Sequence, residues 1–369
     1  MEGVECEGAR AIAIKVLRVR APVSAGVLLS YKCTGECRHC MYACSPLAPS
    51  DWIDPGGLRR VLEELAPSVV PASPRGRIGV NEGLHFTGGE PFLNYPLLLE
   101  TVRLAEELGF PSVFVETNCF WCTSVEVARE KFLELKAAGL EGVLVSANPF
   151  VVEHVPFDRV EKGVAAALEV FGERGTLVYH PVYLRALGAL GVRGTLKFED
   201  YERRLLELDP ALLLAGFNPG ILLPMGRLVY TLAHLYDRKP AKAFTSVSCA
   251  EELTRDWHVH VDCYYNYIPG YCAGISLGDA RRLRELVEGG VDLGDRPVLA
   301  ALAESLGSLL ELAREHGYRE LERGYVSPCH LCLDARLHLT IEVGGFKELQ
   351  PRSFYEALAR LRELPPRAG

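Results

Sequence analysis

Three cysteines with the spacing of a metal-cluster loop follow the first predicted strand. Cys33, Cys37 and Cys40 form a CxxxCxxC pattern on one short segment. Thiolates at this spacing can hold three irons of a cubane iron–sulfur cluster and leave the fourth iron open. An open iron can chelate a small molecule and pass an electron to it. Structural zinc is the alternative, because zinc sites also use closely spaced cysteines.

A second set of cysteines lies in the last third of the chain. We expect four of them to form one four-thiolate metal site: Cys249, Cys272, Cys329 and Cys332. Cys263 is left over within a predicted β-hairpin. Four cysteines suit either an iron–sulfur cluster or structural zinc, so the cysteines alone do not identify the metal.

Three further side chains follow predicted strands, where parallel α/β sheets place their chemistry. Cys119 and Cys122 follow the third strand, and His180 follows the fifth. The two thiols could ligate a cluster, form a redox dithiol or donate a hydrogen atom, which makes them candidate catalytic residues. They could equally fill space in the core as small apolar side chains. His180 is a candidate polar residue of the site, or a histidine with a purely structural partner.

The elements that must position these residues alternate between strand and helix for most of the first 236 residues. Such alternation predicts an α/β fold, with a parallel sheet covered by helices. The expected strands are residues 23–30, 83–86, 112–116, 142–146, 176–179 and 212–222. The expected helices are residues 58–65, 95–108, 124–138, 157–171, 201–208 and 227–236. After residue 239 the rhythm changes, which predicts a second domain.

The segment FTGGEPFL closes the second predicted strand, at residues 86–93. Glycines at a strand's carboxyl end let the backbone approach a ligand closely. The order CxxxCxxC, helix, strand, GGEP resembles the radical S-adenosylmethionine (radical SAM) superfamily over residues 23–236. The resemblance implies a partial (β/α)6 TIM-like barrel with a smaller C-terminal cysteine-rich α+β domain. The implied division is an extension at residues 1–20, the barrel at 21–240 and the second domain at 241–369.

The resemblance also implies cofactors and a reaction. Cys33, Cys37 and Cys40 would ligate a [4Fe–4S] cluster whose open iron binds the amino and carboxylate groups of SAM. Reductive cleavage would give methionine and a 5′-deoxyadenosyl radical, which takes a hydrogen atom from an unactivated C–H bond. A ferredoxin or flavodoxin would be the electron donor. The residues implied to contact SAM are Gly88, Gly89, Glu90, Glu116, Asn118, Ser146 and Asn148.

Residues 261–272 resemble part of the auxiliary-cluster module known as SPASM, or its shorter twitch form. A full SPASM module has more cysteines than this segment offers, so the resemblance implies at most one auxiliary [4Fe–4S] cluster. Residues 117–151 resemble a narrower branch that reads TNGxWA and then SxDxFH. This chain departs from the branch at Cys119, Cys122, Asn148 and Val151, so a shared substrate is not implied.

The composition of the chain restricts the partners and the cell compartment that we expect for it. Forty Lys and Arg residues stand against 48 Asp and Glu, a net charge of −8, which argues against a nucleic-acid partner. The longest charge-free stretches are broken by proline and glycine and are too short to cross a bilayer. An acidic first segment does not resemble a signal peptide, so we expect a cytoplasmic, reducing location. Few Gln, Asn and Met residues indicate a thermophile tendency.

The substrate stays open among a small molecule, a lipid or prenyl chain, and a peptide or protein side chain. Few residues precede the first predicted strand, which disfavours a peptide-recognition domain there. The apolar run 211–225 could line an apolar entrance to the barrel that suits a lipid, or it could be a buried last strand. The alternative to an enzyme is a non-enzymatic iron–sulfur or zinc protein.

Overall fold

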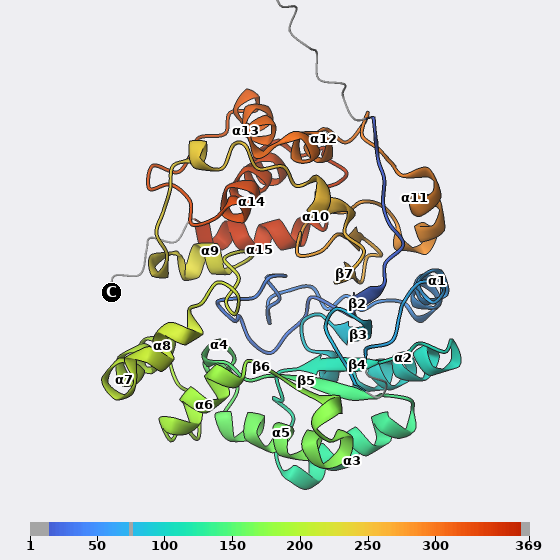
Figure 1. Cartoon of the computed structure of the whole chain (residues 1–369), viewed down its shortest axis with the longest axis vertical. Coiled ribbons are helices and arrows are strands. Elements are labelled where there is room, and N and C mark those ends of the chain that lie inside the picture. Colours follow the sequence, from blue (N-terminus) through green and yellow to red (C-terminus); the bar gives the residue numbers. More distant parts are fainter. Residues whose placement is uncertain (1–14, 74–76, 363–369) are drawn as a thin grey trace, which may run out of the picture.

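The computed structural model describes residues 15–73 and 77–362, and the predicted extension at residues 1–20 falls largely outside them. The fold is α/β, as predicted, and its centre is a seven-stranded sheet in the order β6-β5-β4-β3-β2-β7-β8. Every neighbouring pair from β6 to β7 is parallel, and only β8 runs antiparallel to its neighbour. Helices cover the outer face, which gives a partial TIM-like barrel (Figure 1).

The strands are short and mostly buried, and the five strands of the sheet that precede residue 180 agree with predicted strands to within a few residues. The sheet consists of β2 (Ser24–Leu28), β3 (Gly83–Thr87), β4 (Phe114–Thr117), β5 (Gly142–Ser146), β6 (Thr176–Tyr179), β7 (Val259–Val261) and β8 (Tyr267–Ile268). A separate antiparallel pair joins β1 (Val16–Leu17) to β9 (Val291–Asp292).

The helices of the barrel begin where the sequence supplies a capping side chain. The Asp54 and Ser124 side chains, for example, accept hydrogen bonds from the backbone N–H groups of Gly57 and Val127. These helices are α1 (Pro55–Leu65), α2 (Tyr95–Glu107), α3 (Val125–Ala137), α4 (Pro149–Val152), α5 (Phe157–Phe171), α6 (Pro181–Ala189), α7 (Phe198–Leu208), α8 (Pro210–Gly216) and α9 (Leu228–Thr231). Short 3-10 turns are η1 (Pro91–Asn94), η2 (Glu173–Gly175) and η3 (Ala233–Leu235).

The C-terminal third is mainly helical and gathers on one side of the barrel, at the top of Figure 1. It contains α10 (Ala250–Thr254), α11 (Leu283–Gly289), α12 (Pro297–Glu304), α13 (Leu306–Glu315), α14 (Pro328–His338) and α15 (Arg352–Arg362). Single turns are η4 (Ala241–Ala243), η5 (Ala280–Arg282) and the π-turn η6 (Leu339–Val343). The predicted hairpin is present as β7 and β8, but β7 also pairs with β2 and so extends the barrel sheet.

Two predicted elements are wrong. The strand expected at residues 212–222 is instead α8 followed by turns. Asp209 and Pro210 are the reason, because Asp209 Oδ1 accepts from the Leu212 N–H at 3.0 Å and proline occupies the first helical turn. The helix expected at residues 227–236 is reduced to α9 and η3.

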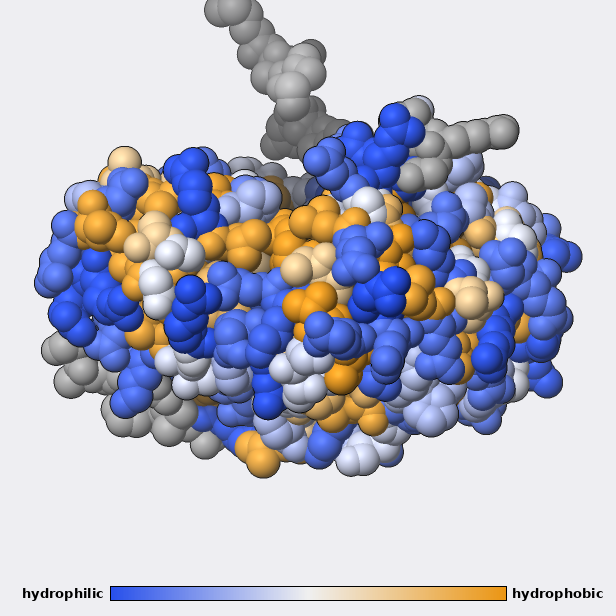
Figure 2. All heavy atoms as spheres, turned by 90° about the horizontal axis from the view of Figure 1, so that it is seen from below, coloured by the Kyte–Doolittle hydropathy of each residue, from blue (hydrophilic) through white to orange (hydrophobic). Residues whose placement is uncertain are grey.

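The face seen from below in Figure 2 intermixes hydrophilic and hydrophobic residues, with the hydrophilic ones more abundant. Over residues 15–73 and 77–362, none of the helices has the length and apolar character that crossing a bilayer requires.

Candidate functional site

The loop after β2 gathers the three predicted cluster cysteines. Burial, followed by the neighbouring Glu90 and Cys40, raises the pKa of the Cys33 thiol to about 12. The pKa of Cys37 is likewise raised by burial and then by its neighbours Cys33 and Cys40. Thiols that affect one another in this way would repel as bare thiolates, whereas iron ions between them would remove that penalty. The donor set therefore fits an iron–sulfur cluster.

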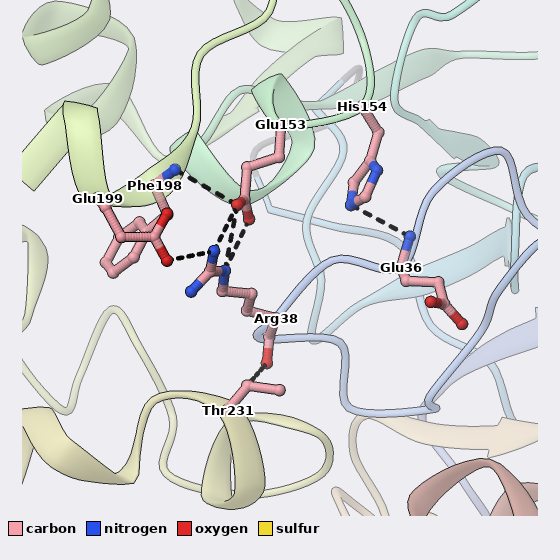
Figure 3. Close-up of polar contacts among 7 residues, drawn as sticks. All are labelled: Glu36, Arg38, Glu153, His154, Phe198, Glu199 and Thr231. Carbon is pink, nitrogen blue, oxygen red and sulfur yellow. Dashed lines mark hydrogen bonds and ion pairs between the residues drawn. The ribbon is translucent and has the colours of Figure 1, made fainter. Parts of the chain in front are cut away.

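Side chains from later elements fix this loop in place (Figure 3). The Arg38 guanidinium donates to both carboxylate oxygens of Glu153, with Nη2 at 2.7 Å from Oε1 and Nε at 3.0 Å from Oε2. The Thr231 hydroxyl donates to the Arg38 carbonyl at 2.7 Å. The Glu36 N–H donates to the His154 imidazole at 3.3 Å. Contacts from α4 and α9 thus hold both sides of the cysteine loop.

Arg227 supports the same loop from behind. Its guanidinium donates to the backbone carbonyls of Cys37 at 2.9 Å and Cys44 at 2.8 Å, and the side chain is nearly inaccessible. Gly226, just before it, has a φ of 58°, and a Cβ there would lie 2.5 Å from the Met41 Cα. The close approach of these two segments therefore requires glycine.

The GGEP segment packs directly against the cysteine loop. The Gly89 N–H donates to the Ser30 carbonyl at 2.8 Å. A Cβ at Gly89 would lie 1.7 Å from the Lys32 carbonyl oxygen, so no larger residue fits without displacing the loop. This contact explains the second glycine of the motif in physical terms.

Glu90 joins the GGEP segment to the end of β4. Its carboxylate accepts hydrogen bonds from the Thr117 hydroxyl at 2.9 Å, the Asn118 N–H at 2.8 Å and the Phe92 N–H at 3.2 Å. Burial raises the pKa of Glu90 to about 7. The Asn118 side chain in turn donates to the Thr34 hydroxyl at 2.9 Å, which connects β4 to the cysteine loop.

One cavity of about 430 Å³ lies between these segments, within the size range of small-ligand sites. Its lining includes eight of the predicted site residues: Cys33, Cys37, Cys40, Gly88, Gly89, Glu116, Asn118 and Ser146. Glu90 lies buried beside it and supports its walls. The Asn148 side chain is also buried, and it accepts from the Val151 N–H at 3.0 Å as the cap of α4.

The three predicted catalytic residues lie outside this lining. The chain turns at Cys119, with a φ of 62°, and both thiols pack toward α5. A Cβ at Gly163 would lie 2.3 Å from Cys119 Sγ and 3.3 Å from Cys122 Sγ. The His180 ring caps α6, where Nδ1 accepts from the Val182 N–H at 3.3 Å. The two thiols therefore pack in the core, and the His180 ring caps a helix.

The four predicted C-terminal metal ligands come together from α10, the segment after β8, and α14. Burial and then the proximity of Cys332 and Cys329 raise the pKa of Cys272 to about 12. The pKa of Cys249 is raised by burial and by all three of the other thiols. Cys263 lies elsewhere, beside Asp262. Among the described side chains, no three His, Cys, Asp or Glu groups stand close enough to hold a single ion.

Six aromatic and imidazole side chains that were not predicted as site residues also line the cavity: His39, Tyr42, Tyr179, His258, His260 and Tyr271. The His-x-His spacing of His258 and His260 is the sequence signal that could have identified these two histidines as site residues. The expected second domain at residues 241–369 separates this spacing from the barrel, whereas β7 is a strand of the barrel sheet.

The match to a family model agrees with this geometry. Residues 27–177 match the family model of the radical SAM superfamily. Among solved structures, BtrN in complex with AdoMet and 2-DOIA is 13% identical, with a TM-score of 0.41, over 78% of this chain and 89% of that chain. Streptococcus suis SuiB bound to S-adenosylmethionine is 9% identical, with a TM-score of 0.36, over 84% of this chain and 77% of that one. Among curated proteins, none matches this chain.

Proposed function

We propose that the protein, whose residues 27–177 match the family model of the radical SAM superfamily, reductively cleaves SAM and abstracts a hydrogen atom from an unactivated C–H bond of a substrate. The observation that carries the proposal is the convergence of Cys33, Cys37 and Cys40 with the GGEP segment on one cavity. The [4Fe–4S] cluster that these cysteines would bind supplies the electron for cleavage.

The chain's own residues position the reactants. Gly88 and Gly89 allow the backbone to approach the methionyl end of SAM, while Glu90 holds that backbone through three accepted hydrogen bonds. Ser146, at the end of β5, offers a hydroxyl to the same cavity. Apolar side chains close the remaining wall and exclude water from a radical that would otherwise be quenched. They include Leu144, Val151, Ile221, Leu222, Leu223 and Met225.

We further propose that residues 241–369 act as an auxiliary-cluster domain, with Cys249, Cys272, Cys329 and Cys332 as ligands of one iron–sulfur cluster. The buried Arg336 supports this, because its Nε donates to Cys332 Sγ at 3.2 Å and places a cation beside the thiolates. Tyr271 lines the cavity and Cys272 is the next residue, so the second site would lie directly behind the cavity wall. Such a cluster would transfer electrons or hold the substrate.

The substrate itself is open among a small molecule, a peptide side chain and a lipid or prenyl chain. The predicted apolar run contributes residues 221–223 and 225 to the cavity lining, which supports an apolar portion at that end of the substrate. A cytoplasmic location and a ferredoxin or flavodoxin as electron donor complete the proposal.

Anaerobic purification followed by iron and sulfide analysis tests the proposal. We expect roughly eight irons per chain, as two [4Fe–4S] clusters require. Addition of dithionite and SAM should then yield 5′-deoxyadenosine and methionine, detected by liquid chromatography. Bound zinc without SAM cleavage would instead identify a non-enzymatic metal protein.

A further inference from the structure

Two histidines occupy neighbouring positions on the cavity side of the sheet. The strand register pairs His85 of β3 with Gly26 of β2, and Gly26 with His260 of β7. The two imidazole centroids are 5.3 Å apart. A Cβ at Gly26 would lie 2.3 Å from His85 Nε2 and 2.5 Å from His260 Cδ2. The missing side chain of Gly26 therefore makes room for both rings.

A third histidine completes the group. The His258 ring lies with its centroid 4.8 Å from that of His260, and both rings line the cavity. His85 lies behind them, 6.0 Å from His258 between ring centroids. We call these three side chains the histidine wall.

The histidine wall contains polar atoms without protein partners. His85 is 1% exposed and His260 is 3% exposed. Neither ring nitrogen of His85 has a hydrogen-bond partner among the described residues, and neither does Nδ1 of His260. His85 Nε2 lies 3.9 Å from Glu116 Oε1, which is beyond hydrogen-bond distance. Leaving buried polar atoms unpaired costs about 1–3 kcal/mol each, so such atoms beside a cavity indicate a polar ligand.

This side of the cavity offers hydrogen-bond acceptors, so it favours a ligand that donates hydrogen bonds. His258 Nδ1 lies 3.0 Å from the Val80 carbonyl oxygen, which can only accept, so Nδ1 carries the proton. Burial lowers the pKa of His258, so the ring is neutral at pH 7 and its Nε2 is an acceptor. Glu116 adds a carboxylate that lines the same cavity.

Among the described residues that line the cavity there is neither lysine nor arginine, and Glu116 is the one acidic side chain. Arg255 lies near enough to lower the pKa of His258, but it packs on Tyr271 and is not part of the lining. A phosphate or carboxylate at the histidine wall would therefore meet neutral rings and a carboxylate, with no lysine or arginine of the lining to pair with it. A hydroxyl or amino group would instead donate to His258 and Glu116.

We propose that His258, His260 and Glu116 bind a hydroxyl- or amino-bearing, non-anionic portion of the substrate, with His85 as the positioning residue behind them. The inference rests on the proposed function, because the cavity is the one assigned there to SAM and substrate. It narrows the substrate class by excluding phosphorylated or carboxylated groups at this wall.

Equilibrium dialysis of the cluster-loaded protein with SAM tests the inference, using radiolabelled glucosamine, glucose and glucose 6-phosphate as probes. We expect glucosamine and glucose to be retained and glucose 6-phosphate to be excluded. His260→Leu should weaken retention about fivefold to tenfold, as loss of one buried hydrogen bond predicts. His260→Gln, which keeps an amide donor and acceptor, should restore part of it. His234→Leu, a change at an exposed position, is the matched control.

Reductive SAM cleavage without substrate, measured on the same samples, separates the two proposals. If the wild type forms no 5′-deoxyadenosine, the proposed function fails whatever the probes do. If the wild type cleaves SAM, the control His234→Leu should cleave it equally. Iron analysis and urea denaturation of His260→Leu establish that this variant is folded and cluster-loaded, so its binding result is decisive. Equal retention of the phosphorylated probe, unchanged retention by His260→Leu, or no retention of any probe would each overturn the inference.

Discussion

The guanidinium of Arg227 donates a hydrogen bond of 2.9 Å to the backbone carbonyl of Cys37, across 190 residues of sequence. A second bond of 2.8 Å reaches the Cys44 carbonyl, so one buried cation holds two points of the cysteine loop. The loop's shape therefore depends on the far end of the barrel as well as on its own sequence.

Replacing this cation should loosen the loop before any metal is bound. Arg227→Met should lower the free energy of unfolding of the cluster-free protein by about 2 kcal/mol or more, because charged buried hydrogen bonds contribute about 1.5–3 kcal/mol. Urea denaturation measures the change. Arg193→Met, at a side chain that is 81% exposed, should change it by less than about 0.5 kcal/mol. Equal effects of the two substitutions would contradict the role of Arg227.

Loss of one cysteine from the loop after β2 should show that the two metal sites load with iron independently. Cys37→Ala should abolish 5′-deoxyadenosine formation and remove about half of the bound iron, since only the cluster beside the cavity loses a ligand. Iron analysis together with the SAM cleavage assay measures both. Complete loss of iron from this variant would show that the two sites do not load independently.

The reciprocal change tests the C-terminal ligands. Cys272→Ala should remove the other half of the iron while SAM cleavage without substrate persists, because the first cluster is intact. Cys263→Ala is the matched control, since Cys263 lies beside Asp262 and apart from the four thiols. Iron loss from the Cys263 variant equal to that from the Cys272 variant would refute the assigned ligand set.

A single methyl group at Gly89 should displace the cysteine loop. The added Cβ would lie 1.7 Å from the Lys32 carbonyl oxygen, a distance that no side-chain rotation can relieve. We expect Gly89→Ala to lose SAM binding, measured by equilibrium dialysis. Gly188→Ala in α6 has open space around the new methyl group and should leave binding unchanged. Wild-type affinity in Gly89→Ala would disprove the close packing.

The buried imidazole of His85 should make stability depend on pH. Burial lowers its pKa to about 3, whereas an unfolded histidine titrates near 6.5. The unfolded state therefore takes up a proton first, and stability is lost as the pH falls from about 6.5 toward 3. The slope for one such group is at most about 1.4 kcal/mol per pH unit.

His85→Leu removes that titrating group. In urea denaturation of the cluster-free protein at pH 7, 6 and 5, the variant should lose stability less steeply with acidification than the wild type. His234→Leu, at an exposed position, should follow the wild-type slope. Parallel curves for wild type and His85→Leu would mean that His85 stays protonatable in the folded protein.

Local sequence patterns were sufficient to predict most of the helices and strands before residue 210 and the cysteine loop. Residues 142–146, 157–171 and 176–179 have the predicted bounds, because hydrophobic periodicity and capping residues act over a few positions. The CxxxCxxC and GGEP segments were recognisable for the same reason, as each is a short motif at the end of one strand. The predicted strand at 212–222 failed where Asp209 and Pro210 start a helix instead.

The direction in which side chains face, and the contacts between distant segments, depend on how the whole chain folds. Cys119 and Cys122 follow β4 as predicted, yet a φ of 62° at Cys119 turns the thiols toward Gly163 and away from the cavity. His85 and His260 become neighbours because β7 returns to pair with β2, and Gly26 leaves room between them. Strand pairing sets these contacts through hydrogen bonds between segments more than 150 residues apart, which local sequence patterns do not encode.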